Sequence, residues 1–130
     1  MIVHFPVGLL ISGVVFEIYG ALRNDEVAET AGRYNIRFGF WCLFPVLLVG
    51  FLGMISLENT EEFKDFLSSH LTFALCTAGL FFLAMLVSRY LRQPLGRALY
   101  FIIIGVGGIC VLTTGYFGGE LVHRFGVSTH

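Results

Sequence analysis

The stretch "FGFWCLFPVLLVGFLGMISL", residues 38–57, is twenty residues long and contains no charged side chain. A helix needs about 20 apolar residues to cross the roughly 30 Å hydrocarbon core of a bilayer, so this stretch predicts a membrane span. Three more apolar stretches of sufficient length lie at residues 2–22, 66–91 and 99–122. Alternating segments of about ten residues, typical of membrane β-barrels, are not visible in the sequence. The sequence therefore predicts an all-α integral-membrane four-helix bundle in up-down-up-down order.

The composition supports a membrane protein of several spans. The 130 residues are 56% hydrophobic and only 13% charged, with a mean hydropathy of +0.82, whereas soluble domains carry about 25% charged residues. The length predicts a single domain, residues 1–130. A net charge of −1 gives a nucleic-acid role no electrostatic basis. The three cysteines lie inside apolar stretches without a CxxC or CxxCH motif, which argues against disulfides, zinc knuckles and c-type haem.

Basic residues are unevenly divided between the two ends of the expected bundle. Six arginines border or occupy the first and third loops, namely Arg23, Arg33, Arg37, Arg89, Arg92 and Arg97. The other end carries only Lys64 and Arg124. By the positive-inside rule, the first and third loops face the cytoplasm. We therefore expect a multi-pass protein of the bacterial inner membrane with both termini on the periplasmic side.

Three histidines lie at the edges of apolar stretches. His4 begins the first span, His70 lies near the start of the third, and His123 follows the fourth. Because the first and third spans run in the same direction and the fourth returns, all three are expected near the outer leaflet. Ionisable groups in membrane segments are costly and are functional candidates by default. A single histidine at a helix end can also be an ordinary interfacial residue, so the prediction is a shared role for at least two of them.

The fourth span carries a stripe of small residues. Gly115, Gly119 and His123 recur at i, i+4 and i+8 and share one helical face. Small residues allow a second backbone or a flat cofactor to approach closely. Packing between helices alone would explain such a stripe as well. The stripe therefore makes Gly115 and Gly119 candidate cofactor-binding residues without deciding between these interpretations.

Neutral imidazole is a common axial ligand of haem iron and also binds transition metals. A haem between the helices of a bundle needs two histidines at similar depth, and any two of His4, His70 and His123 could hold it, with His70 and His123 the favoured pair. A three-histidine zinc or copper site is the other interpretation. Glu17, near the inner end of the first span, is interpreted as a snorkelling or arginine-paired structural acid rather than a proton relay.

Two motifs resemble those of a known family. The start "VHFPVGLL" (residues 3–10) and the ending "TGYFGGELVHRFGV" (residues 114–127) are similar to motifs of a bacterial family of four-helix membrane proteins classed as a domain of unknown function. The family pattern falls on His4, Gly118, Gly119 and His123, and His70 fits the histidine that opens the third helix. Tyr116 and Phe125 stand where other members carry histidine. Members often occur beside planctomycete-type cytochrome c domains, which implies redox chemistry at the outer face.

The leading hypothesis is a small b-type haem-binding electron-transfer protein, or the haem-bearing anchor subunit of a respiratory or photosynthetic complex. It would work near the outer leaflet with quinol or a c-type cytochrome, and a quinone is a second candidate cofactor. Its expected partners are membrane lipid, other membrane subunits and a c-type cytochrome, with no nucleic acid. This hypothesis favours an electron-transfer or accessory subunit over a stand-alone enzyme, without deciding between them. The alternatives are a cofactor-free structural subunit and a metal-binding or transport-associated membrane protein that uses the histidines and Glu120.

Overall fold

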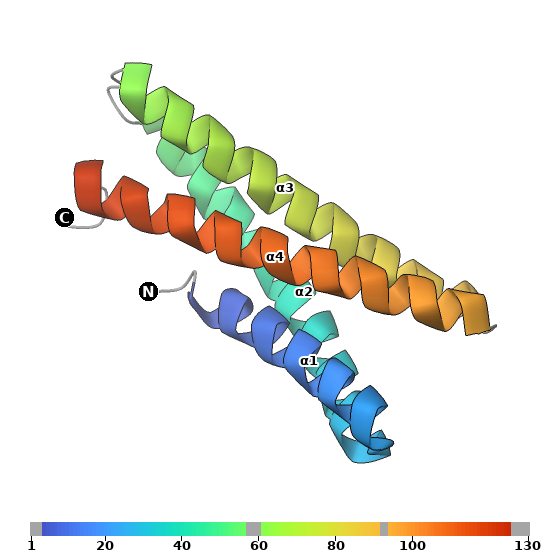
Figure 1. The fold of residues 1–130 in the computed structure, drawn as a ribbon. Helices are drawn as coiled ribbons and strands as arrows, with labels where there is room; N and C mark the ends of the chain where they lie inside the picture. The colour runs from blue at the N-terminus through green and yellow to red at the C-terminus, as the bar shows by residue number, and fades with distance from the viewer. Residues whose placement is uncertain (1–3, 57–60, 92–93, 126–130) are drawn as a thin grey trace.

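The computed structural model describes residues 4–56, 61–91 and 94–125, and nearly all of them are helical. In chain order the helices are α1 (His4–Arg23), α2 (Glu26–Ser56), α3 (Glu61–Tyr90) and α4 (Pro94–Phe125) (Figure 1). All four are long and apolar enough to cross a membrane. No strand occurs in the described ranges. The predicted all-α fold with four membrane helices is therefore confirmed.

The bundle is built from two helical hairpins. The contacts of α1 are mainly with α2 and those of α3 mainly with α4, while α1–α4 and α2–α3 contacts join the hairpins less extensively. Figure 1 shows α3 running along α4, and α1 lying beside part of the longer α2. Because consecutive helices are antiparallel, the last residues of α1 and α3 and the first residues of α2 and α4 lie at one end of the bundle (Figure 1). We call this the loop end.

The turn between α1 and α2 is defined by a C-cap followed directly by an N-cap. Asn24 adopts a left-handed conformation with φ of 53°, and the Asp25 N–H donates to the Gly20 carbonyl at 2.9 Å, which is the pattern of a Schellman motif. The Asp25 carboxylate then accepts hydrogen bonds from the backbone N–H groups of Val27 and Ala28. A side-chain oxygen at this position satisfies donors that the first helical turn leaves free. As a result, α2 begins directly after Asp25.

This early start extends α2 well beyond the apolar stretch from which it was predicted. The second span was expected from about residue 38, whereas the helix begins at Glu26. Arg33 and Arg37, expected to border or occupy the first loop, both lie on α2. The apolar stretch marks the part of a helix that meets lipid, whereas the caps determine where the helix begins. The other helix bounds differ from the predicted spans by five residues or fewer.

The buried core joins the hairpins along the middle of the bundle. It contains Leu10, Val14, Ile36, Phe40, Phe81, Ala84, Val87, Tyr100, Ile103, Ile104 and Val111. On the α3–α4 side, the Phe81 ring lies over Gly107, where an added Cβ would be 3.1 Å from the ring. The Phe40 ring on α2 stacks with Phe82 on α3, their centroids 6.0 Å apart. Many large apolar side chains outside this core are exposed, as a lipid-facing surface requires.

Glycines allow α1 and α2 to approach each other very closely. A Cβ added at Gly32 would lie 2.7 Å from the Glu17 backbone nitrogen and 2.8 Å from the Gly13 carbonyl oxygen. A Cβ at Gly20 would lie 2.6 Å from the backbone nitrogen of Glu29. Small residues are the usual basis of such close helix pairs in membranes. The first hairpin is therefore held together by direct contact between backbones.

Candidate functional site

His70 is the one predicted histidine that the structure places against another helix. It is half-buried, and its Nδ1 lies 3.0 Å from the Thr114 carbonyl oxygen on α4. A Cβ added at Gly118 would lie 3.2 Å from the His70 Cε1 atom, so the ring rests on this glycine. Phe73 lies one turn further along α3, and Phe117 precedes Gly118 on α4. The rings of these two phenylalanines stack on each other, with their centroids 5.7 Å apart. The third and fourth helices thus hold one imidazole ring in a fixed position next to two aromatic rings.

The hydrogen bond to Thr114 assigns the roles of the two ring nitrogens. A carbonyl oxygen can only accept, so Nδ1 of His70 must carry the proton and donate. In the neutral ring, Nε2 then keeps its lone pair. A histidine whose Nδ1–H is held by a backbone carbonyl is a common arrangement for a metal-ligating imidazole. His70 is therefore oriented to offer Nε2 as a ligand.

The other two predicted histidines occupy different surroundings. His4 is exposed in the first turn of α1, and His123 is exposed in the last turn of α4. His123 follows Gly118 by five residues, so it lies about 140° around the α4 axis from the glycine that contacts His70. Within the described ranges there is no group of three or more His, Cys, Asp or Glu side chains that could hold a metal ion. The three histidines thus do not form a ready-made ligand cluster in a single chain.

The predicted glycine stripe also lies on the surface. Gly115 and Gly119 are exposed, and a Cβ added at either would meet no atom within 4 Å. The close approach predicted for α4 is instead made at Gly118, by His70, and at Gly107, by Phe81. The stripe that carries His123 is consequently open toward lipid or toward another molecule.

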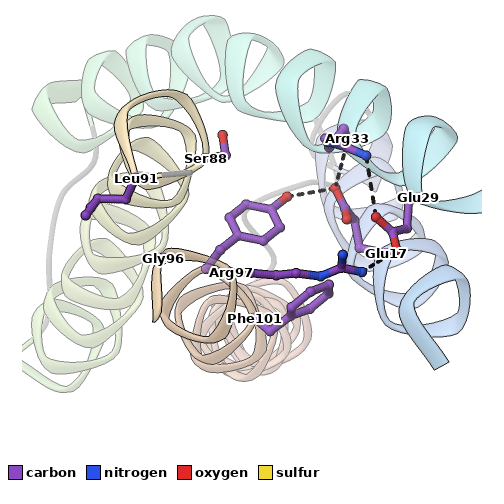
Figure 2. Close-up of a pocket in the computed structure, with 9 residues that line it drawn as sticks. Glu17, Glu29, Arg33, Ser88, Leu91, Gly96, Arg97 and Phe101 are labelled. Atoms are coloured by element: carbon purple, nitrogen blue, oxygen red, sulfur yellow. Dashed lines mark hydrogen bonds and ion pairs between the residues drawn. The ribbon is translucent and has the colours of Figure 1, made fainter. Parts of the chain in front are cut away.

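A second polar constellation joins the hairpins at the loop end. Glu17 on α1 is only 1% exposed, and its Oε1 accepts a hydrogen bond of 2.8 Å from the Tyr100 hydroxyl on α4. The Arg33 guanidinium lies 3.7 Å from the same oxygen and 3.5 Å from Glu29. Arg97 on α4 pairs with Glu29 at 2.7 Å (Figure 2). One continuous network therefore connects α1, α2 and α4.

These side chains line a cleft of about 190 Å³ together with Ser88, Leu91, Gly96 and Phe101. Figure 2 shows the Arg97 side chain extending across the cleft toward Glu29, next to the Phe101 ring. Two arginines face two glutamates, so their formal charges cancel. Burying a carboxylate is costly unless hydrogen bonds and an opposite charge compensate it, and Glu17 has both. The network is thus a structural connection between the hairpins.

Part of this network is predictable from the sequence. The interpretation of Glu17 as an arginine-paired acid is confirmed by its contact with Arg33. Tyr100 and Arg97 were not identified as partners, although both lie at the start of the fourth span, at the same membrane end as Glu17. The shared depth of an acid, a tyrosine and an arginine was the available signal. Shared depth alone does not show that the side chains of Glu17, Arg97 and Tyr100 face one another.

Fold and composition together define an all-helical membrane protein with four spans. The chain belongs to the family described as "Predicted membrane protein (DUF2231)", whose model matches residues 1–130. This confirms the resemblance drawn from the two terminal motifs. Neither the curated proteins nor the solved structures include a match to the chain.

Proposed function

We propose that this protein is a haem-binding electron-transfer subunit of the bacterial inner membrane, with His70 as an axial ligand of haem b. The orientation of His70 is the observation that carries the proposal. Its Nδ1–H is held by the Thr114 carbonyl, and its ring rests on Gly118, so the ring orientation is fixed before any ligand binds. The other ring nitrogen, Nε2, keeps a free lone pair, and a neutral imidazole nitrogen of this kind is a common ligand of haem iron.

The residues around His70 fit a flat, apolar group. Phe73 and Phe117 provide stacked rings next to it, and Gly115 and Gly119 leave the neighbouring surface of α4 free of side chains. His4 or His123, both of which are exposed, would supply the second nitrogen that holds the iron together with His70. Haem b supplies reversible one-electron transfer when it is bound. The residues of the chain would fix its position and exclude water from the side that faces α3 and α4.

The charge distribution supports an orientation with the loop end in the cytoplasm. The described arginines of the first, second and third helices, together with Arg97, lie toward the loop end, whereas Lys64 and Arg124 lie at the opposite end. By the positive-inside rule, we infer that the histidines lie toward the periplasmic leaflet. The proposed donors and acceptors are therefore quinol in the membrane and a c-type cytochrome outside it.

The test is the reduced-minus-oxidised absorbance spectrum of the detergent-purified protein, with haem quantified as its pyridine haemochrome. We expect a b-type α-band and about one haem per chain. His70→Ala should lower haem retention more than about tenfold, because even changes next to a metal ligand cost 10–100-fold in affinity. His130→Ala, which alters a histidine outside the proposed set, is the matched control and should retain haem.

Two further variants identify the second ligand. Whichever of His4→Ala and His123→Ala removes it should convert a six-coordinate low-spin spectrum into a high-spin one, while the other leaves the spectrum unchanged. A fully assembled wild-type protein with no haem contradicts the proposal. So does full haem retention by His70→Ala.

A cofactor-free structural subunit is the second candidate function. The open stripe of Gly115 and Gly119 favours it, because a helix of a partner subunit could lie directly on the α4 backbone there. In that case the spectrum would be flat, and Gly119→Leu would prevent co-purification of the partner while leaving the chain in the membrane. The same spectrum thus separates the two candidates.

A further inference from the structure

A second hollow lies along the first turns of α2. It is lined by Thr30, Arg33, Tyr34 and Arg37. Their spacing of i, i+3, i+4 and i+7 places them along one helical face. All four residues are exposed. This hollow is separate from the cleft between the hairpins, although Arg33 borders both.

Arg37 has an unusual position for an unpaired charge. It directly precedes the apolar stretch 38–57 and belongs to a helix apolar enough to cross the membrane. The acids of the network, Glu17 and Glu29, are engaged by Arg33 and Arg97, and no ion pair involves Arg37 in the described part of the chain. A charged side chain at the edge of a span is costly unless it finds an anion or reaches the interface. An anionic partner at the interface would compensate the charge of Arg37.

The neighbouring aromatic residues place the hollow at headgroup level. Tyr34 is 67% exposed and Trp41, one turn beyond Arg37, is 63% exposed. Tyrosine and tryptophan are enriched where the hydrocarbon meets the headgroups. Phe38, between them, is exposed as well and offers a surface for acyl chains. A ligand in this hollow would therefore have its polar part beside the arginines and its apolar part along Phe38 and Trp41.

We infer that this hollow binds the phosphate of an anionic phospholipid headgroup. The guanidinium of Arg37 donates to the phosphate oxygens, with further donors from Arg33 and the Tyr34 hydroxyl. The planar fork of arginine matches phosphate geometry, and such charge-assisted hydrogen bonds are strong. The ligand is a lipid rather than a soluble phosphate because the exposed apolar side chains of Phe38 and Trp41 follow the hollow along α2. The site needs no haem and is independent of the proposed function.

Native mass spectrometry of the detergent-purified full chain tests the inference. Phosphatidylglycerol should bind more tightly than phosphatidylcholine, and Arg37→Gln should weaken phosphatidylglycerol binding about tenfold, the loss expected for one charge-assisted hydrogen bond. Arg89→Gln is the matched control, because Arg89 is also an exposed arginine toward the loop end. It should leave binding unchanged. Tyr34→Phe, which changes one exposed hydroxyl, should weaken binding by about threefold.

Each other result overturns the inference. Equal binding of the two lipids would mean that the site does not distinguish an anionic headgroup from a zwitterionic one. Equal losses in Arg37→Gln and Arg89→Gln would mean that only the general positive charge attracts lipid. Displacement of phosphatidylglycerol by millimolar inorganic phosphate would identify a site for a soluble anion. If Arg37→Gln fails to fold, unchanged binding by Tyr34→Phe overturns the inference instead.

Discussion

Gly32→Ala is expected to lower the free energy of unfolding by about 1–3 kcal/mol, the usual cost of overpacking a tight contact. The new methyl group would lie 2.7 Å from the Glu17 backbone nitrogen and 2.8 Å from the Gly13 carbonyl oxygen. Both atoms belong to the α1 backbone, so neither can move aside by a side-chain rotation. The hairpin would have to open, and that would also pull Glu17 away from Arg33. Titration of the purified protein with denaturing detergent, followed by the fluorescence of its single tryptophan, measures the loss.

Gly79→Ala is the matched control for this variant. Gly79 lies inside α3, where an added Cβ would meet nothing within 4 Å. The substitution should leave the protein as stable or raise its stability by about 0.5–1 kcal/mol, because alanine loses less conformational freedom in a helix than glycine does. Equal stability of Gly32→Ala and the wild type would mean that the two helices are not held in direct backbone contact.

The fold was predictable because lipid imposes a simple requirement on sequence. Each apolar stretch of about 20 residues has to be helical, since its backbone groups find no other partners in the bilayer. The start of α2 was not predictable in this way. Residues 26–37, which include Arg33 and Arg37, are too polar to be recognised as part of a span, and the first turn depends on the Asp25 cap. Hydropathy identifies the lipid-facing part of a helix, and capping chemistry identifies its end.

The candidate site was less predictable, because the sequence does not specify which faces of two helices meet. The spacing of Gly115, Gly119 and His123 correctly placed them on one side of α4, but that side is exposed. The residue that receives His70 is Gly118, which lies between the other two glycines in the chain and on a different face. Successive residues of a helix are rotated by about 100°, so Gly118 contacts His70 while the next residue, Gly119, lies on the open surface.

The pairing of Glu17 was partly predictable, and its partners differ in what they contribute. Arg33 follows from the need of a buried acid for a nearby cation, and the two residues lie on neighbouring helices. The Arg33 side chain is 47% exposed and 3.7 Å away, so solvent screens much of its attraction. The Tyr100 hydroxyl, 83 residues further along the chain, makes the buried hydrogen bond. Its contribution depends on how the second hairpin docks onto the first.

Glu17→Ala is accordingly expected to destabilise the protein by about 1–3 kcal/mol, chiefly because the buried Tyr100 hydroxyl loses its acceptor. Glu17→Gln keeps an oxygen that can accept this hydrogen bond, so it should cost less than Glu17→Ala. Both values come from the same detergent titration. The comparison separates loss of the hydrogen-bond acceptor from loss of the negative charge.

A double-mutant cycle with Tyr100→Phe assigns the effect to the pair. Removing both partners of a buried hydrogen bond leaves no unsatisfied polar group, so the double variant Glu17→Ala/Tyr100→Phe should be more stable than the sum of the single losses predicts. A coupling energy of about 1–2 kcal/mol is expected for two residues in direct contact. Glu29→Gln with Tyr100→Phe is the control cycle, because Glu29 bonds to Arg97 and not to Tyr100. Strict additivity in the first cycle would mean that Glu17 stabilises the bundle through Arg33 and not through the Tyr100 hydroxyl.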